Sequence, residues 1–502
     1  MTDSTLTDFD SSRRSGFARA CALACAAALL ASCGGGNSSD AAAPQVTAPH
    51  SEVPAHLTVK LTINGPARAV AGTRYTYQAS AASGTASAFD WAWGDGSLNT
   101  AGNAAAKVWS AAGIFSSSAS AIVGALTATG TQSVLVVSKP ISAGMNYTCA
   151  LTPSGGAACR GFRGDGTSID RSGLVAAGLT GLKALSVGGE TICFLKLDGT
   201  AGCWGANGAG QLGDGTTVDR LADGTVPEST VPAAVAGLTN AVGLSTSGQH
   251  TCAVKSGGTV ACWGSNSDGQ LGDGANLNKP TATAVSGLTG VTAVATGLAH
   301  TCALKANGTA ACWGNNVSGQ LGDGSSGIAA SKNTPVAVAN LTGAVALTAG
   351  RLHTCALKAN GSVVCWGVNG LGQLGDGSTV DKTSPSGVSG ITSVVALSAA
   401  YDHTCALKAD GTVACWGVNN YGQIGDGTSP TVASANNRSS PVPVLNLAGV
   451  AAISAGTFHT CALKTDGSAA CWGLNVNLQL GDGTGVDSVT PVAVSGGSVF
   501  WK

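Results

Sequence analysis

From about residue 141 onward, short apolar runs alternate with glycine-rich turns, and none shows the 3.6-residue period of a helix. In one representative copy, a three-residue turn separates the runs at 301–304 and 310–313, and a glycine-rich segment follows. Two further runs, at 335–338 and 344–349, lead into the next copy. Four short strands per copy, repeated along the chain, are typical of β-propeller blades. The pattern therefore predicts an all-β fold.

Cysteines mark the copies. Fourteen of the 17 cysteines form seven pairs whose members are ten residues apart. A repeat of roughly 50 residues indicates a propeller or a solenoid, and four strands in each of seven copies predict a seven-bladed β-propeller. The paired cysteines are Cys149, Cys159, Cys193, Cys203, Cys252, Cys262, Cys302, Cys312, Cys355, Cys365, Cys405, Cys415, Cys461 and Cys471.

The cysteine spacing suits a disulfide across each hairpin. A three-residue turn at 306–308 places Cys302 directly opposite Cys312, where Cβ atoms approach to about 4.5–5.5 Å. A modest adjustment then reaches disulfide distance. Closing so short a loop contributes on the order of 2–3 kcal/mol in the chain-entropy model. Zinc is the alternative ligand for paired cysteines, but this spacing is not CxxC.

One motif recurs in these copies. It reads His-Thr-Cys-Ala-Leu-Lys, then Cys-Trp-Gly-x-Asn, then Gly-Gln-Leu-Gly-Asp-Gly. The motif resembles the regulator of chromosome condensation repeat, and the resemblance implies a seven-bladed propeller over residues 138–502. Two copies depart from it, because Arg160 stands where the first needs Trp and Thr191 replaces the His of the second. We therefore expect the first blade to be truncated.

The N-terminus reads as an export signal. Arg13, Arg14 and Arg19 precede an apolar stretch at 20–31, which is too short to span a membrane. The Leu-Ala-Ser-Cys ending at Cys33 resembles the bacterial lipobox, in which the cysteine is acylated and becomes the first residue. A plain signal cleaved near the same place is the alternative.

The lipobox resemblance divides the N-terminal region. It implies a signal peptide at 1–32, which removes two cysteines, followed by a flexible tether at 33–54 that is rich in small and polar residues. Gly34, directly after Cys33, favours the outer membrane over the inner one in this resemblance. The expected location is a periplasmic or cell-surface-facing outer membrane lipoprotein.

A small domain is expected between the tether and the repeats. Residues 55–137 contain Trp91-Ala92-Trp93-Gly94-Asp95-Gly96 and a β-rich tail. This stretch resembles the polycystic-kidney-disease domain, which implies an immunoglobulin-like β-sandwich with aromatics in the core and Gly-Asp-Gly in a turn. Such modules act as spacers or as carbohydrate or protein contacts.

Charge narrows the classes of partner. The chain has 25 basic and 26 acidic residues among 502, so it lacks the clustered Lys and Arg that nucleic-acid phosphates require. We expect no nucleic-acid partner, and membrane contact through the lipid anchor only. The guanine-nucleotide-exchange role known in the resembled family needs a cytosolic GTPase, and export argues against such a partner.

Repeated polar residues tempt a catalytic or metal-binding interpretation. A residue that recurs in blade after blade occupies the same structural position each time, and one His or one Asp per blade is too few for a metal site. We therefore expect hydrogen bonding from the histidines, blade-to-blade packing from the tryptophans and turn stabilisation from the aspartates. No metal, cofactor or catalytic residue is predicted. The repeated histidines are His250, His300, His353, His403 and His459.

The positions at which the repeats differ are more informative. In a four-strand blade the first and third connections lie at one end and the second lies at the other. The variable residues belong to the first and third connections, whereas the second reads Lys-x-Asx-Gly in most copies. One face is thus diversified, as expected of a binding face. Interface hot spots favour Tyr, Trp and Arg, so the predicted partner-binding residues are Arg351, Tyr401, Tyr421 and Phe458.

These observations predict a non-enzymatic, lipid-anchored envelope protein that binds a protein, or alternatively a glycan, through the variable face. A secreted inhibitor of β-lactamase shares the resembled fold, so enzyme inhibition is one form of such binding. The alternative class is an exported hydrolase or lyase that uses the propeller channel. Carboxylates or histidines clustered at the channel mouth would favour that alternative, and an apolar channel would count against it.

Overall fold

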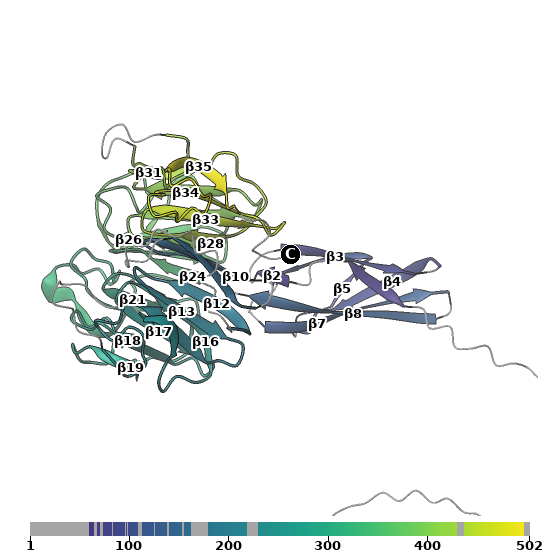
Figure 1. Cartoon of the computed structure of the whole chain (residues 1–502), viewed down its shortest axis with the longest axis horizontal. Coiled ribbons are helices and arrows are strands. Elements are labelled where there is room, and N and C mark those ends of the chain that lie inside the picture. The colour runs from purple at the N-terminus through teal and green to yellow at the C-terminus, as the bar shows by residue number, and fades with distance from the viewer. Residues whose placement is uncertain are drawn as a thin grey trace, which may run out of the picture. The chain divides into compact units, whose positions relative to one another are not determined.

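The computed structural model shows an all-β chain (Figure 1). In the part of the chain that it describes there is no α-helix, and the single helical turn is the 3-10 helix η1 (Ile328–Ala330). The described residues are 60–64, 68–70, 74–82, 84–95, 97, 99–108, 113–124, 126–137, 140–152, 155–161, 179–217, 229–428 and 436–495.

The N-terminal module consists of two sheets (Figure 1). The smaller sheet is antiparallel, with β1 (Leu61–Asn64), β3 (Arg74–Ala81) and β6 (Ala104–Val108) in that order. In the larger sheet β2 pairs in parallel with β8, and the other neighbours are antiparallel. Its order is β2 (Arg68–Val70), β8 (Leu126–Val137), β7 (Gly113–Val123), β4 (Ala86–Ala92) and β5 (Thr100–Ala101).

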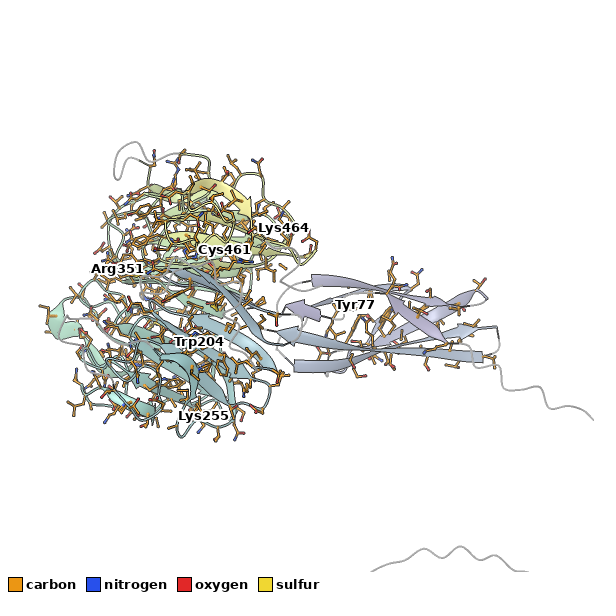
Figure 2. The ribbon with its side chains drawn as sticks, in the orientation of Figure 1. Tyr77, Trp204, Lys255, Arg351, Cys461 and Lys464 are labelled. Atoms are coloured by element: carbon orange, nitrogen blue, oxygen red, sulfur yellow. A yellow bond between two sulfur atoms is a disulfide. The ribbon has the colours of Figure 1, made fainter. Side chains whose placement is uncertain are left out.

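Aromatic residues form the core of this module. Trp91 and Trp93 are two residues apart, so an extended chain turns both to the same side. They are stacked with 5.2 Å between ring centroids, and Tyr77, labelled in Figure 2, packs edge-on against Trp93 at 5.4 Å. All three are fully buried. The prediction that these aromatics face a core is confirmed.

The rest of the described chain forms seven sheets, which we number sheets 1 to 7 in chain order. Sheets 2 to 7 have four antiparallel strands each, and sheet 1 has three among the described residues. The first strands are β9 (Ile141–Ala143), β12 (Leu182–Val187), β16 (Ala241–Thr246), β20 (Val291–Thr296), β24 (Ala344–Ala349), β28 (Val394–Ala400) and β32 (Val450–Ala455). The second strands are β10 (Tyr147–Leu151), β13 (Thr191–Lys196), β17 (His250–Lys255), β21 (His300–Lys305), β25 (His353–Lys358), β29 (His403–Lys408) and β33 (His459–Lys464).

The third and fourth strands complete the sheets, and the four-strand repeat predicted from the apolar runs is confirmed. The third strands are β11 (Ala157–Gly161), β14 (Ala201–Gly205), β18 (Val260–Gly264), β22 (Ala310–Gly314), β26 (Val363–Gly367), β30 (Val413–Gly417) and β34 (Ala469–Gly473). The fourth strands are β15 (Ser229–Ala234), β19 (Lys279–Ala284), β23 (Lys332–Ala337), β27 (Lys382–Gly387), β31 (Arg438–Pro443) and β35 (Ser488–Ala493).

The second and third strands of every sheet are joined by a disulfide. Cys302 lies directly opposite Cys312 in the β21–β22 register, as the turn length predicts. All seven pairs are bonded, with Cα atoms 4.0 or 4.1 Å apart. The bonds are buried within the sheets, and Cys461 in sheet 7 is labelled in Figure 2. Seven disulfides in one chain indicate an oxidising compartment.

Neighbouring sheets are fastened by one backbone carbonyl. In sheet 3 the carbonyl oxygen of Gln270 accepts two hydrogen bonds from sheet 4, one from Trp313 Nε1 and one from Thr301 Oγ1, both at 2.9 Å. Gly272 has to be glycine here, because a Cβ on it would lie 2.7 Å from Trp313 Nε1 and its φ is +71°. The tryptophans therefore pack between sheets, as predicted. The same carbonyl also accepts a Trp and a Thr donor at Gln320, Gln373 and Gln423.

Sheets 1 and 7 are neighbours, and a threonine-to-glutamine-carbonyl bond of the kind described above also joins them. Thr148 of sheet 1 donates to the carbonyl of Gln479 at 3.0 Å, and the Gly144 carbonyl accepts from the Thr457 amide at 2.8 Å. Arg160 occupies the position of the missing tryptophan and donates to the Ser495 carbonyl at 2.9 Å. The C-terminal residues 498–502, which could complete sheet 1, lie outside the described residues.

A second set of contacts links the first strands. At six junctions a hydroxyl on one first strand accepts a hydrogen bond from a backbone amide of the next. The junction between sheets 4 and 5 lacks the hydroxyl, because Ala295 stands where the other sheets have Ser or Thr. The hydroxyl residues are Ser142, Ser186, Ser245, Thr348, Ser398 and Ser454.

We predict that Ala295→Ser supplies the missing link and stabilises the protein. Ala295 lines an open cavity, so an added hydroxyl has room. One intramolecular hydrogen bond contributes about 1 kcal/mol, so the free energy of unfolding should rise by that amount in urea titrations. Ser398→Ala, which removes an existing link, should lower it by a similar amount. A lower stability for Ala295→Ser would contradict the role assigned to the hydroxyls.

Candidate functional site

The variable loops surround a cavity of about 1020 Å³. The first strands of all seven sheets line it, mainly with Ala, Gly, Ser, Thr and Val. Among the described residues that line it, two are charged, Glu190 and Arg351, and both come from first connections. Residues of first connections, such as Gly189 and Gly248, are among its lining, so the cavity extends to the end of the repeats that carries the first and third connections.

Arg351 is held in place by sheet 6. Its guanidinium lies 4.6 Å from the centroid of the Tyr401 ring and 3.1 Å from a carboxylate oxygen of Asp402. The backbone supports this arrangement, because the Arg351 amide donates to the Tyr401 carbonyl at 2.8 Å. Burial raises the pKa of Asp402, and the charge of Arg351 opposes that effect. The pair is a neutralised, partly buried contact rather than two free charges.

The aromatic residues continue this contact toward sheet 7. Phe458 packs against Tyr401, with 5.8 Å between ring centroids, and edge-on against Tyr421 at 5.2 Å. Each of these side chains is half-buried. The structure thus brings all four predicted partner-binding residues, Arg351, Tyr401, Tyr421 and Phe458, into one continuous cluster, which we call the aromatic wall.

Small residues stand on the other side of the cavity. Gly189 and Gly248 occupy the first connections of sheets 2 and 3, and Gly208 and Ala209 occupy the third connection of sheet 2. Ala209 is the repeat equivalent of Tyr421. Of the third connections, that of sheet 2 contributes its residues to the cavity lining. The mouth is therefore asymmetric, with a bulky wall over sheets 5 to 7 and an open sector over sheets 2 and 3.

The repeated histidines join adjacent sheets rather than bind a ligand. Nε2 of His300 lies 2.9 Å from Thr354 Oγ1, whose own proton goes to the Gln320 carbonyl. Nε2 must then carry a proton and donate it to Thr354, while Nδ1 of His300 is buried without a hydrogen-bond partner among the described residues. The prediction of structural hydrogen bonding is confirmed. The other pairs are His250–Thr301, His353–Thr404, His403–Thr460 and His459–Thr148.

Burial keeps these imidazoles uncharged. All five histidines have no exposed surface. Burial lowers the pKa of His250, His353 and His459 to about 3 and that of His300 and His403 to about 4. Neighbouring positive charges add to the effect, as the His300, His403 and Arg351 charges do at His353.

The repeated aspartates stabilise turns. Asp323 accepts from the backbone amide of Ser325 at 2.9 Å and from its hydroxyl at 2.6 Å. The described residues contain no group of three or more His, Cys, Asp or Glu side chains arranged to hold a metal. They also contain no helix long and apolar enough to cross a membrane. The predicted lipidation site, Cys33, and the signal and tether segments 1–32 and 33–54 lie outside the described residues.

Sequence reasoning did not single out three residues at this site. Asp402 and Glu190 lie in variable connections, and their roles depend on which neighbours the fold supplies. Gln211 belongs to the repeat motif, and the same residue type stands at the equivalent position of the other copies that carry the motif. The sequence feature that could have drawn attention to Gln211 is Ala206, which replaces the Ser or Asn found at the equivalent positions of sheets 3 and 4.

Repeated four-stranded sheets that line one cavity with their first strands define the fold as a β-propeller. The chain belongs to the RCC1-like domain family, which matches residues 164–502. Yeast RCC1 (Prp20), solved bound to Kap60, is similar with a TM-score of 0.55 and 20% identity, covering 72% of this chain and 84% of that one. Prp20p of Saccharomyces cerevisiae gives 0.56 and 21%, covering 72% and 87%, and human WBSCR16 gives 0.53 and 21%, covering 63% and 82%.

We predict that acid destabilises the propeller through its histidines. Their folded-state pKa lies below the ordinary value of 6.5, so the unfolded chain binds more protons between pH 6.5 and about 4. Stability is therefore complete above pH 6.5 and falls on acidification, by about 1.4 kcal/mol per pH unit for each histidine. Urea unfolding at pH 7 and pH 5 measures this slope. The loss for His353→Gln should be about 2 kcal/mol smaller than for the unaltered chain, and an equal loss would contradict the prediction.

Proposed function

We propose that this protein is a non-enzymatic, lipid-anchored component of a bacterial cell envelope that binds a protein partner through the variable face of a seven-bladed propeller. Cys33 carries the lipid, residues 33–54 form the tether, and residues 55–137 form a polycystic-kidney-disease-like, immunoglobulin-like sandwich that acts as a spacer. The outer membrane is the proposed location. The seven disulfides, which indicate an oxidising compartment, support export.

The aromatic wall is the observation that carries this proposal. Its four residues come from three different sheets and from both kinds of variable connection. Their side chains nevertheless form one continuous chain of contacts, from Arg351 through Tyr401 and Phe458 to Tyr421. Binding hot spots are clustered, rich in Tyr and Arg, and partly desolvated before the partner arrives. Half-buried aromatics that support one another lose little side-chain entropy on binding.

Seven joined sheets support the rigid scaffold that such a face requires. Sheets 1 and 7 share the Thr148–Gln479 bond and the Ala143–Ser454 bond that other neighbouring sheets also make. These contacts support a closed ring, in which sheet 1 has three strands among the described residues and the Arg160–Ser495 bond adds a further link to sheet 7. A closed ring holds its loops in fixed relative positions, and such loops are suited to recognition.

A protein partner is favoured over the other candidates. A hydrolase or lyase that uses the channel would need paired acid and base groups. The described part of the cavity lining offers one carboxylate, Glu190, and one guanidinium that Asp402 already neutralises. A glycan usually stacks on an open aromatic face, whereas the rings here pack edge-on or tilted against one another. Inhibition of a target enzyme would be one outcome of protein binding at this face.

Truncation of two aromatic residues of the wall should weaken partner binding. We predict that Tyr401→Ala combined with Tyr421→Ala weakens the affinity for the envelope partner at least 30-fold, because each hot-spot aromatic contributes about 2 kcal/mol or more. The partner is first identified by crosslinking to the intact lipoprotein and mass spectrometry, and dissociation constants are then measured with purified proteins.

The control variant is Leu197→Ala, which removes an exposed apolar side chain from the opposite end of sheet 2. It should bind with unchanged affinity. All variants should unfold at the same urea concentration as the unaltered protein, within error. Unchanged affinity of the double tyrosine variant would reject the wall as the binding site.

The lipid anchor is tested separately. Cys33→Ser should move the protein from the membrane pellet to the soluble periplasmic fraction, because the acceptor thiol for the lipid is lost. Mass spectrometry of the N-terminal peptide of the unaltered protein should show the mass of an acylated cysteine. Membrane association that survives Cys33→Ser would contradict the anchor.

A further inference from the structure

The open sector of the cavity mouth contains a carboxylate and an amide NH2 group that have no hydrogen-bond or ion-pair partner among the described residues. One is the Glu190 carboxylate in the first connection of sheet 2. Its backbone is fixed, because its carbonyl accepts from the Ala206 amide at 3.0 Å, whereas its side chain is exposed and forms no ion pair with a described residue. It is also the carboxylate among the residues that line the cavity.

The second group is the side-chain amide of Gln211. Gln211 lines the cavity but is only 5% exposed, and its Oε1 accepts from the Ala209 amide at 2.8 Å. In sheets 3 and 4 the equivalent Nε2 atoms donate to Ser265 Oγ and Asn315 Oδ1. In sheet 2 that position is Ala206, so Nε2 of Gln211 donates to no described residue.

Gln211 differs from two other glutamines that lack this acceptor. Val368 and Leu474 leave Nε2 of Gln373 and Gln479 completely buried without a partner. Neither of those glutamines lines the cavity, whereas Gln211 does. A nearly buried donor beside an open volume can be satisfied by a ligand atom, and leaving it unsatisfied costs free energy.

The charge at the cavity mouth indicates which kind of ligand would bind there. Arg351, the cation among its lining residues, is paired with Asp402 at 3.1 Å and covered by Tyr401 at 4.6 Å. Glu190 therefore gives the mouth an uncompensated negative charge. A ligand at this position needs a cationic group for Glu190 and an acceptor oxygen for the Gln211 amide.

The floor between these groups suits an extended chain. Gly189, Gly208 and Gly248 have no side chains, and Ala209 has only a methyl group. A volume of about 1020 Å³ is large enough for several residues. An extended segment presents backbone carbonyls at regular intervals with side chains alternating between its two faces, so one carbonyl and one neighbouring side chain can reach the two groups.

We propose that the open sector binds an extended segment of the protein partner that carries a lysine or arginine side chain. Glu190 pairs with the cationic side chain, Gln211 Nε2 donates to a backbone carbonyl of the segment, and the aromatic wall contacts the apolar residues of the partner beyond it. This inference rests on the proposed function and specifies the chemistry of its partner.

The probe is the synthetic peptide acetyl-Gly-Val-Lys-Val-Gly-amide, compared with the same peptide containing norleucine in place of lysine. Ligand-observed saturation-transfer NMR on the intact chain measures both dissociation constants. The lysine peptide should bind about fivefold more tightly than the norleucine peptide, and the difference should shrink as salt is added. Equal affinity of the two peptides would overturn the proposal.

Two variants test the two contacts. Glu190→Gln should reduce the preference for lysine to less than about twofold. Ala206→Ser should restore the acceptor present in sheet 3, occupy Gln211 Nε2 internally and weaken both peptides by about the same factor. A lysine preference that survives Glu190→Gln would overturn the charge pairing, and unchanged peptide affinity in Ala206→Ser would overturn the role of Gln211.

The matched control is Asp198→Asn. It removes one carboxylate from the same sheet at the opposite end, and Asn307 and Asn360 show that Asn makes the same turn bonds as Asp198 does. Peptide binding should be unchanged in this variant. An experiment that rejects the cationic segment in the open sector can be distinguished from one that rejects the proposed function. If Tyr401→Ala with Tyr421→Ala loses the envelope partner while no peptide preference depends on Glu190, the binding face stands and the cationic segment is rejected.

Discussion

The backbone carbonyl of the repeat glutamine is the point on which the arrangement of the sheets depends. It accepts one proton from the tryptophan and one from the threonine of the next sheet, as Gln270 does from Trp313 and Thr301. The imidazole of the preceding histidine then completes the chain of bonds through the threonine hydroxyl. Because a buried carbonyl must be satisfied, each sheet requires the next one. The motif is therefore explained by the junctions between sheets rather than by any one sheet.

The same junctions explain why the histidines have a structural role and why the loops are the place for recognition. The histidines are neutral, buried and already bonded, so they offer no accessible ligand. The variable residues of the loops at the cavity mouth are not required for the hydrogen bonds that join the sheets, and they differ from sheet to sheet. Where the loops carry large side chains they form the aromatic wall, and where they carry Gly and Ala they leave the open sector. The cavity mouth thus combines the aromatic wall on one side with the polar groups of the open sector on the other.

Much of the architecture could be predicted because it repeats. The cysteine spacing indicated the hairpin register, and the structure confirms it at Cys302 and Cys312. The apolar runs predicted the strands, and the repeated histidines and aspartates were correctly interpreted as structural. The four wall residues were chosen by residue type and variable position alone. Their mutual contact could not be predicted, because it depends on how side chains of different sheets pack against one another.

By itself the sequence determined the local structure, the disulfide pairing and the face on which variation collects, since each depends on residues close in the chain. Only the tertiary structure decided which charges are neutralised and which remain. Arg351 and Glu190 look alike as exposed charged residues in variable loops, yet sheet 6 supplies a carboxylate and a ring to the first, while no described residue pairs with the second. Replacement of one polar residue by Ala206 likewise acts at a distance of five residues, on the amide of Gln211. The physical reason is that pairing and burial are properties of neighbours in space, and neighbours across a junction are set by the packing of whole sheets.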